Sequence, residues 1–142
     1  MKRILVLTVM LTGLSFAITA SAAPGGATLT IRHQVKGCHS WSLNGGAWKT
    51  TQAAHVARGG SIVVTNNDVM FHKLVKVSGP AVKYTLLKTG MAMKGTVKLP
   101  WAPGLMGRPG ATVKVTFPAK GTYVFKTVFG EDNTLRLVVT AS

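Results

Sequence analysis

The side chains best suited to chemistry in this chain are donors for a metal ion. His33 lies upstream of the single cysteine, Cys38, and His39 follows it directly. A third histidine, His72, lies further along the chain, with Met70 two residues before it. A thiolate with imidazoles and a weak thioether suits copper, because soft sulfur selects Cu(I) and a trigonal arrangement tolerates Cu(II). Zinc accepts the same thiolate and imidazole donors in a closed tetrahedron.

Each of these donors also has a purely structural interpretation. Cys38 is compatible with a buried small apolar residue, and His72 with a strand cap. On the apolar face of a strand, His33 is by default a satisfied core histidine; the same holds for His39, and the spacing does not say which of the two turns inward. His55 precedes a turn, and we expect it to face solvent.

Two strands joined by a polar loop must position His72. β-Branched residues fill positions 62–64 and apolar residues recur over 74–77, as on a half-buried pleated surface. Between them, Asn66-Asn67-Asp68 supplies side chains that tolerate turn geometry and bond to their own backbone. His72 comes where the second strand begins, so the hairpin would hold its ring at the edge of a sheet.

The rest of the chain alternates between apolar and polar residues, with regular turn signals. A strand expected over residues 28–35 carries His33 on its apolar face, and Asn44-Gly45-Gly46 favours a tight hairpin. Residues 88–110 are rich in Gly, Pro and Met and predict a long crossover loop. Seven or eight short strands without a helical period predict an all-β, Greek-key β-sandwich. Further strands are expected over residues 81–87, 96–99, 112–117, 121–129 and 134–140.

Two motifs resemble the cupredoxins, the plastocyanin and azurin family. In the first, a strand is followed by Asn66-Asn67, a short spacer, His72 and an apolar strand. In the second, residues 121–127 match the family's Gly-x-Tyr-x-Phe-x-Cys strand, except that Thr127 stands where the family places its copper-binding cysteine. The resemblance covers the second half of the domain well and the first half loosely.

The resemblance implies a cupredoxin-like sandwich in which three loops gather at one pole. These loops are residues 36–40, 66–72 and 129–133. Cys38 would then supply the thiol from the first loop instead of the last. The implied copper ligands are Cys38, His72, one or both of His33 and His39, and Met70 as a weak ligand.

The first 22 residues predict a secretory signal peptide. Lys2-Arg3 is positively charged, residues 4–18 are apolar, and Ala20-Ser21-Ala22 is a small-residue cleavage pattern. Its removal leaves one domain over residues 23–142 without a membrane span, which we expect to be secreted or held in the periplasm or cell envelope. One cysteine cannot form an intramolecular disulfide.

The chain is strongly cationic. It has 17 Lys and Arg against 3 Asp and Glu, a formal charge of +14; without Lys2 and Arg3 the basic residues number 15 and the charge is +12. Such a charge favours anionic partners through salt-sensitive attraction, so we expect contact with an anionic envelope surface. The basic residues are scattered and no aromatic platform interleaves with them, so nucleic acid is not an expected partner. The other expected partner is a redox or copper-handling protein.

No enzyme template fits the sequence. The only acids are Asp68, Glu131 and Asp132, which do not form a carboxylate pair suited to glycoside hydrolysis. Cys38 and His39 are adjacent, and neighbouring residues on a strand point to opposite faces, so they are poorly placed as a nucleophile and its base. We therefore expect copper carriage, copper buffering or one-electron transfer. The alternative is a metal-free interaction module of the same fold with a cationic surface.

Overall fold

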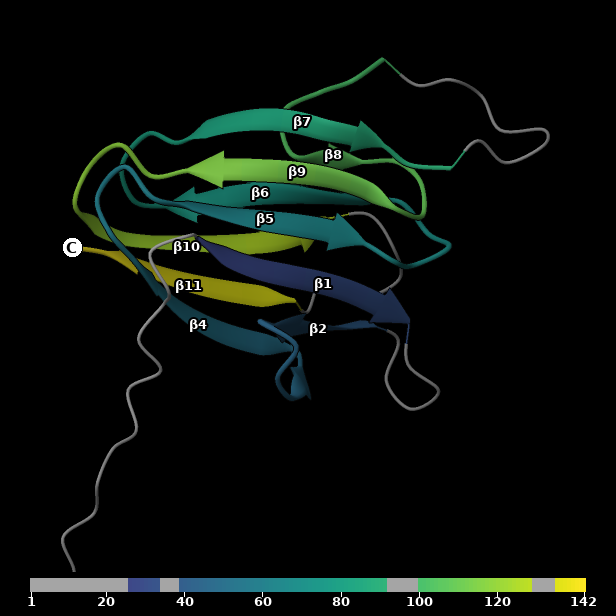
Figure 1. Cartoon of the computed structure of the whole chain (residues 1–142), viewed down its shortest axis with the longest axis horizontal. Coiled ribbons are helices and arrows are strands. Elements are labelled where there is room, and N and C mark those ends of the chain that lie inside the picture. The colour runs from purple at the N-terminus through teal and green to yellow at the C-terminus, as the bar shows by residue number, and fades with distance from the viewer. Residues whose placement is uncertain (1–25, 34–38, 92–99, 129–134) are drawn as a thin grey trace, which may run out of the picture.

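The computed structural model describes residues 26–33, 39–91, 100–128 and 135–142, and these form two β-sheets packed face to face (Figure 1). The predicted signal peptide, Cys38, the strand expected over residues 96–99, and the acids Glu131 and Asp132 lie outside the described residues. Within the described ranges, no helix has the length and apolar character needed to cross a membrane.

The first sheet has six strands in the order β3-β2-β1-β5-β9-β7. The pairing of β1 with β5 is parallel and the other pairings are antiparallel. A parallel pair requires a crossover connection. Here the chain leaves the first sheet after β3, forms β4 in the second sheet, and returns to the first sheet as β5. The bounds are Ala27–His33 for β1, His39–Leu43 for β2, Trp48–Lys49 for β3, Ser61–Asn66 for β5, Lys83–Thr89 for β7 and Ala111–Thr116 for β9.

The second sheet has five strands in the order β4-β11-β10-β6-β8. Its one parallel pair is β11 with β4. Figure 1 shows the two sheets as layers, with the chain passing from one to the other several times. The bounds are Thr51–Val56 for β4, His72–Ser78 for β6, Leu105–Met106 for β8, Gly121–Val128 for β10 and Arg136–Ala141 for β11.

The core lies between the sheets and is filled by alternate residues of nearly every strand. In β10, for example, Tyr123 and Phe125 are fully buried, while Val124 between them and Lys126 after them face outward. Their rings make edge-to-face contacts with Phe117, with centroids 4.9 and 6.1 Å apart, a favoured aromatic geometry. The Tyr123 hydroxyl donates a hydrogen bond to the carbonyl of Ala119 (2.6 Å), which fixes the turn before β10.

The prediction of an all-β sandwich is confirmed, and so is the hairpin at Asn44-Gly45. Both residues have positive φ, as a tight hairpin turn requires. The described residues contain eleven strand segments instead of seven or eight. The sequence did not predict β4, because two alanines at positions 53 and 54 have low strand propensity; pairing with β11 outweighs that preference.

The crossover region forms β8 against β6, which was predicted as loop. The amide of Leu74 donates to the carbonyl of Gly104 (2.9 Å). Gly104 has a φ of +79°, and a Cβ at this position would collide with the carbonyl oxygen of Leu74. Only glycine lets the backbone pass this close, so a segment rich in Gly and Pro still adds a strand to the sheet beside His72.

Candidate metal centre

Three histidines meet between the two sheets at one end of the sandwich. His33 ends β1 and His39 begins β2, and the two are paired in register across the strands. His72 begins β6 in the opposite sheet. The ring centroids of His33 and His39 lie 5.4 Å apart and those of His39 and His72 lie 4.9 Å apart. The imidazoles therefore form one continuous cluster that both sheets contribute to.

Asp68, in the loop between β5 and β6, joins two of these histidines. Its Oδ2 accepts a hydrogen bond from His39 Nδ1 at 2.7 Å and lies 3.4 Å from His72 Nε2. Its Oδ1 accepts a hydrogen bond from the backbone N–H of Met70 at 3.0 Å. With its Nδ1 proton donated to a carboxylate, His39 presents Nε2 as the free donor atom, which is how outer carboxylates orient metal-binding histidines.

The local environment sets the charge of both groups. Burial opposes ionisation of Asp68, but the hydrogen bonds from the Met70 backbone and from His39, together with the nearby ring of His72, outweigh it and lower its pKa below the ordinary 3.8. Burial lowers the pKa of His72 below 6.5, although the nearby Asp68 carboxylate partly offsets this. At neutral pH Asp68 is therefore a carboxylate and His72 a neutral imidazole, the form that binds metal ions.

Asn66 holds the loop that carries Asp68. Its side chain is fully buried, and its Nδ2 donates to the carbonyls of Met70 (2.8 Å) and Met106 (3.1 Å). Its Oδ1 accepts from the backbone N–H of Asp68 (2.9 Å). One amide thus connects the end of β5, the loop and β8, in the manner of an Asx turn.

Several buried polar atoms at this end have no hydrogen-bond partner among the described residues. They include His39 Nε2 and both ring nitrogens of His72; the 3.4 Å contact of His72 Nε2 with Asp68 lacks hydrogen-bond geometry. Buried polar groups are nearly always paired, so unpaired imidazole nitrogens are what a metal site would leave free. One donor atom from each of His33, His39 and Asp68 lies within 4.8 Å of the others. Donors to a single ion at about 2.0–2.2 Å lie roughly 3–4 Å apart, so the nitrogen and oxygen set fits an ion after small side-chain movements.

The structure brings together three of the five predicted ligands. His39 and His72 are buried, whereas His33 is exposed at the rim. The interpretation of His33 as a core histidine is therefore wrong, because β1 ends there. Met70 is half-buried and lies before β6 begins, so strand alternation does not place its thioether on the side of His72. Cys38 lies outside the described residues, and His55 is exposed on β4, as expected.

Sequence reasoning missed Asp68 as a site residue and treated it as a turn former. It serves both roles, one with each carboxylate oxygen. The available signal was its rarity: it is one of three acids in a chain of 142 residues and lies four residues before His72. Thr127, at the position of the family's cysteine, is buried and pairs in register with Leu74, so it belongs to the inner face near His72.

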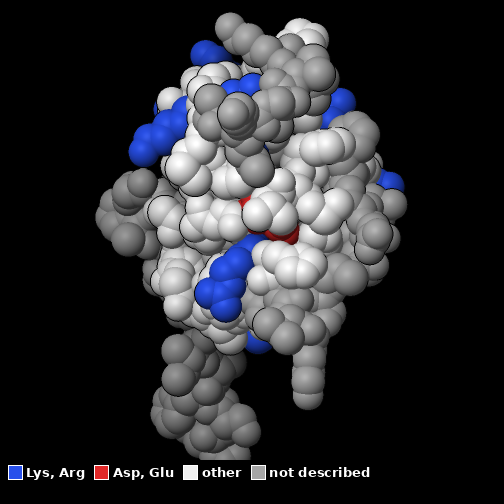
Figure 2. Space-filling model, turned by 90° about the vertical axis from the view of Figure 1, so that its right-hand side faces the viewer, with Lys and Arg blue, Asp and Glu red and all other residues white. Residues whose placement is uncertain are grey.

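Figure 2 looks onto this end of the sandwich. A small red area, the colour of acidic residues, shows between white and blue side chains. Asp68 is the only acid among the described residues and is 1% exposed. Among the described residues, the surface around the histidine cluster is therefore neutral and basic, and the one acidic side chain lies beneath it.

Comparisons with known proteins give structural neighbours only. No protein-family model matches the sequence, and no curated protein matches it. Among solved structures, the chain is similar to an amicyanin mutant in its reduced state, with 18% identity, 87% of this chain and 88% of that chain covered, and a TM-score of 0.46. It is also similar to a purple cupredoxin from Nitrosopumilus maritimus, with 17% identity, 81% and 98% covered, and a TM-score of 0.46. Similarity at this level assigns no ligand or activity to this chain. The strand pairing by itself shows the all-β sandwich of two sheets that the sequence predicted.

Proposed function

We propose that this chain is an exported copper-binding protein that carries or buffers copper, or transfers single electrons through it. The observation that supports this most strongly is the buried cluster of imidazoles from both sheets, with nitrogens left unpaired beside a carboxylate. His33 and His39 would hold the ion with Asp68 beside them, because one donor atom from each lies within 4.8 Å of the others, and His72, whose ring centroid lies 4.9 Å from that of His39, would complete the set. Cys38 and Met70 are further candidate ligands.

The chain's own residues prepare such a site in three ways. Asp68 accepts a hydrogen bond from the Nδ1–H of His39 and so leaves the lone pair of Nε2 as the free donor. Burial keeps His72 neutral and able to donate a lone pair. Asn66 holds the Asp68 loop in place. Copper would bind imidazole ligands more tightly than the other first-row divalent ions do. It would also supply a one-electron couple.

A metal-free interaction module explains the site less well. Leaving a buried polar atom unpaired costs about 1–3 kcal/mol. His39 Nε2 and the two nitrogens of His72 are all buried and unpaired among the described residues. A protein that kept only its fold would gain stability by replacing these side chains with apolar ones.

Metal titration of the purified protein tests the proposal. We expect one equivalent of Cu(II) to bind the metal-free protein, to outcompete Zn(II) and to raise the melting temperature. His39→Gln and His72→Gln should each weaken copper binding at least tenfold. His55→Gln is the matched control, because His55 is exposed on the outer face of β4. The proposal is wrong if copper leaves the melting temperature unchanged, or if the His55 variant weakens binding as much as the other two.

The absorption spectrum and the reduction potential of the copper protein separate the candidate ligands. If the Cys38 thiolate binds copper, the Cu(II) protein should show a strong sulfur-to-copper absorption in the visible range that Cys38→Ser removes. If only imidazoles and oxygen bind, Cys38→Ser should leave spectrum and stoichiometry unchanged. Met70→Leu should change the reduction potential only if the thioether is a ligand.

The proposed export has its own measurement. The mass of the protein recovered outside the cytoplasm should correspond to a chain beginning near residue 23. Recovery of the intact chain from the cytoplasm alone contradicts export and leaves the metal-binding proposal standing.

A further inference from the structure

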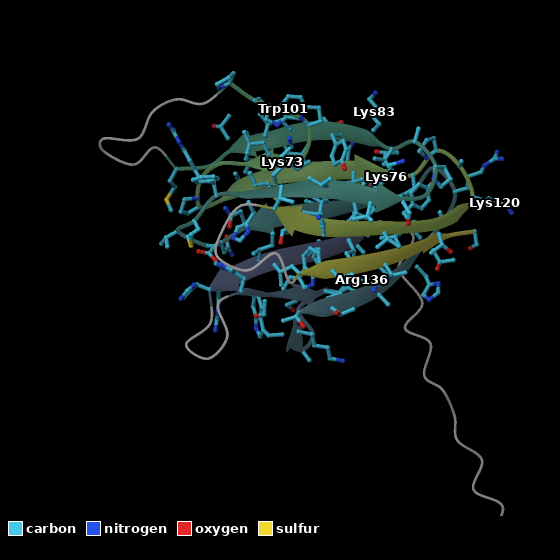
Figure 3. The ribbon with its side chains drawn as sticks, turned by 180° about the vertical axis from the view of Figure 1, so that it is seen from behind. Lys73, Lys76, Lys83, Trp101, Lys120 and Arg136 are labelled. Carbon is cyan, nitrogen blue, oxygen red and sulfur yellow. The ribbon has the colours of Figure 1, made fainter. Side chains whose placement is uncertain are left out.

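We propose that the outer face of the five-stranded sheet docks this protein on an anionic lipid bilayer. The surface concerned, here called the cationic face, carries Lys73 on β6, Lys126 on β10 and Arg136 on β11, with Trp101 at its β8 edge. Figure 3 looks onto this sheet and labels Lys73, Arg136 and Trp101 on the side toward the viewer. This surface is separate from the histidine cluster, which lies between the sheets.

The strand register gathers the three cations. Lys126 and Arg136 are direct partners across β10 and β11. Lys73 is the partner of Val128 on β10, two residues beyond Lys126 and on the same face. All three point outward, because the residues beside them in sequence, such as Leu74 and Leu137, are buried in the core.

This arrangement is unfavourable without an anionic partner. Like charges directly opposite each other on neighbouring strands destabilise a sheet. Among the described residues, the only acid is Asp68, and it is buried between His39 and His72. No described carboxylate therefore offsets the charge of the cationic face.

The other side chains on this face suit a bilayer better than a small ligand. Val75, Val124 and Val138 occupy outward positions on three adjacent strands and are half-buried, which gives this face a weakly apolar character between its cations. Trp101 is 44% exposed in the segment before β8, and Figure 3 shows it near Lys73. Tryptophan prefers the boundary between headgroups and acyl chains, and lysine and arginine are attracted to anionic headgroups.

Vesicle binding by the purified protein tests this proposal. We expect binding to phosphatidylcholine vesicles that contain one-third phosphatidylglycerol, no binding to pure phosphatidylcholine, and steep weakening with added salt. Each cation near such a surface contributes about a fivefold factor in affinity, so the triple variant K73Q/K126Q/R136Q should bind roughly a hundredfold more weakly. Trp101→Phe should weaken binding severalfold and lose a blue shift of tryptophan fluorescence on adding vesicles.

The matched control is K49Q/K88Q/K114Q. It removes the same number of charges, but from strands β3, β7 and β9 of the other sheet. It should keep most of the affinity. Equal losses of vesicle affinity in the two triple variants would mean that net charge alone drives binding. No binding to anionic vesicles would leave only a protein partner for this face. Either result overturns the proposal.

Folding and metal binding do not confound this test. Removing Lys126 and Arg136 relieves repulsion between paired strands, so the triple variant should melt no lower than the unmodified protein. Vesicle binding measured in EDTA and with copper should agree, because no metal-site residue lies on the cationic face. Failure of copper binding would therefore leave this proposal intact, and the reverse also holds.

Discussion

The carboxylate of Asp68 is the residue-scale feature that gives the histidine cluster a defined chemistry. Asp68→Asn keeps the shape of the side chain but replaces the acceptor facing His39 Nδ1 with a weaker one. His39 is then free to take the tautomer that protonates Nε2 and removes its donor lone pair. We expect copper affinity to fall by about 10- to 100-fold, as for other outer-sphere partners of metal-binding histidines.

A double-mutant cycle identifies the route of this effect. If Asp68 acts through His39, then Asp68→Asn should cost little further affinity in a His39→Gln background, measured by competition with a copper chelator. Additive losses would show that Asp68 contacts the ion directly. Unchanged affinity in Asp68→Asn alone would contradict the orienting role.

Thr127 offers a second test at the residue scale. Its hydroxyl is buried without a partner among the described residues, on the inner face one strand away from His72. Thr127→Cys, in a Cys38→Ser background, should place a thiolate beside the imidazoles. Adding Cu(II) should then produce an intense visible absorption that the Cys38→Ser protein lacks. No new absorption would mean that copper binds nearer His33 and the rim.

At the scale of elements, the loop between β5 and β6 depends on a single buried amide. Asn66 makes three hydrogen bonds, to Asp68, Met70 and Met106. Asn66→Ala removes them, and at about 1 kcal/mol each it should lower the free energy of unfolding by roughly 2–4 kcal/mol in denaturant titration. Copper affinity should fall as well. Asn67→Ala is the matched control: its side chain is exposed, so the change should stay within about 0.5 kcal/mol.

Strand β7 carries a titratable group that the fold depends on. Burial raises the pKa of Tyr84 above 10.0, although a hydrogen bond with the Lys76 backbone partly offsets this. The folded state therefore favours the neutral phenol. Its contribution to stability is complete below pH 10 and is lost as pH rises through the raised pKa. Tyr84→Phe should show a shallower fall in melting temperature above pH 10; an identical fall in both proteins would contradict this.

The sequence predicted the sandwich well because its strongest signals are local. Alternation fixed the inner faces of β5, β9 and β10, and Asn44-Gly45 fixed a turn. The sequence did not predict β4 and β8, because their residues become strands only through pairing with distant partners. The same distinction holds for the site. His72 was identified from its hairpin, whereas the contact of Asp68 with His39 depends on packing that joins residues 29 positions apart.

At the scale of the whole molecule, the charge is divided unevenly. The chain has 17 basic residues and 3 acidic ones, and the single acid among the described residues is buried with two histidines. The outer surface of both sheets is thus cationic wherever it is described and charged. Self-repulsion of this kind favours solubility and anionic partners but destabilises the compact state.

A charge reversal measures how much of this repulsion is local. Arg136→Glu places a carboxylate opposite Lys126, whereas Lys88→Glu makes the same change in net charge opposite Thr112. Both variants should be more stable than the unmodified protein at low ionic strength. Arg136→Glu should exceed Lys88→Glu by about 0.2–1 kcal/mol because it adds a cross-strand ion pair. Denaturant titration at low and high salt measures the stabilisation that each variant gives. The excess of Arg136→Glu over Lys88→Glu should shrink in molar salt, where the screening length falls to about 3 Å. Equal stabilisation by the two variants at low salt would show that Lys126 and Arg136 do not repel each other across the strands, and would remove the cost on which the argument for an anionic partner rests.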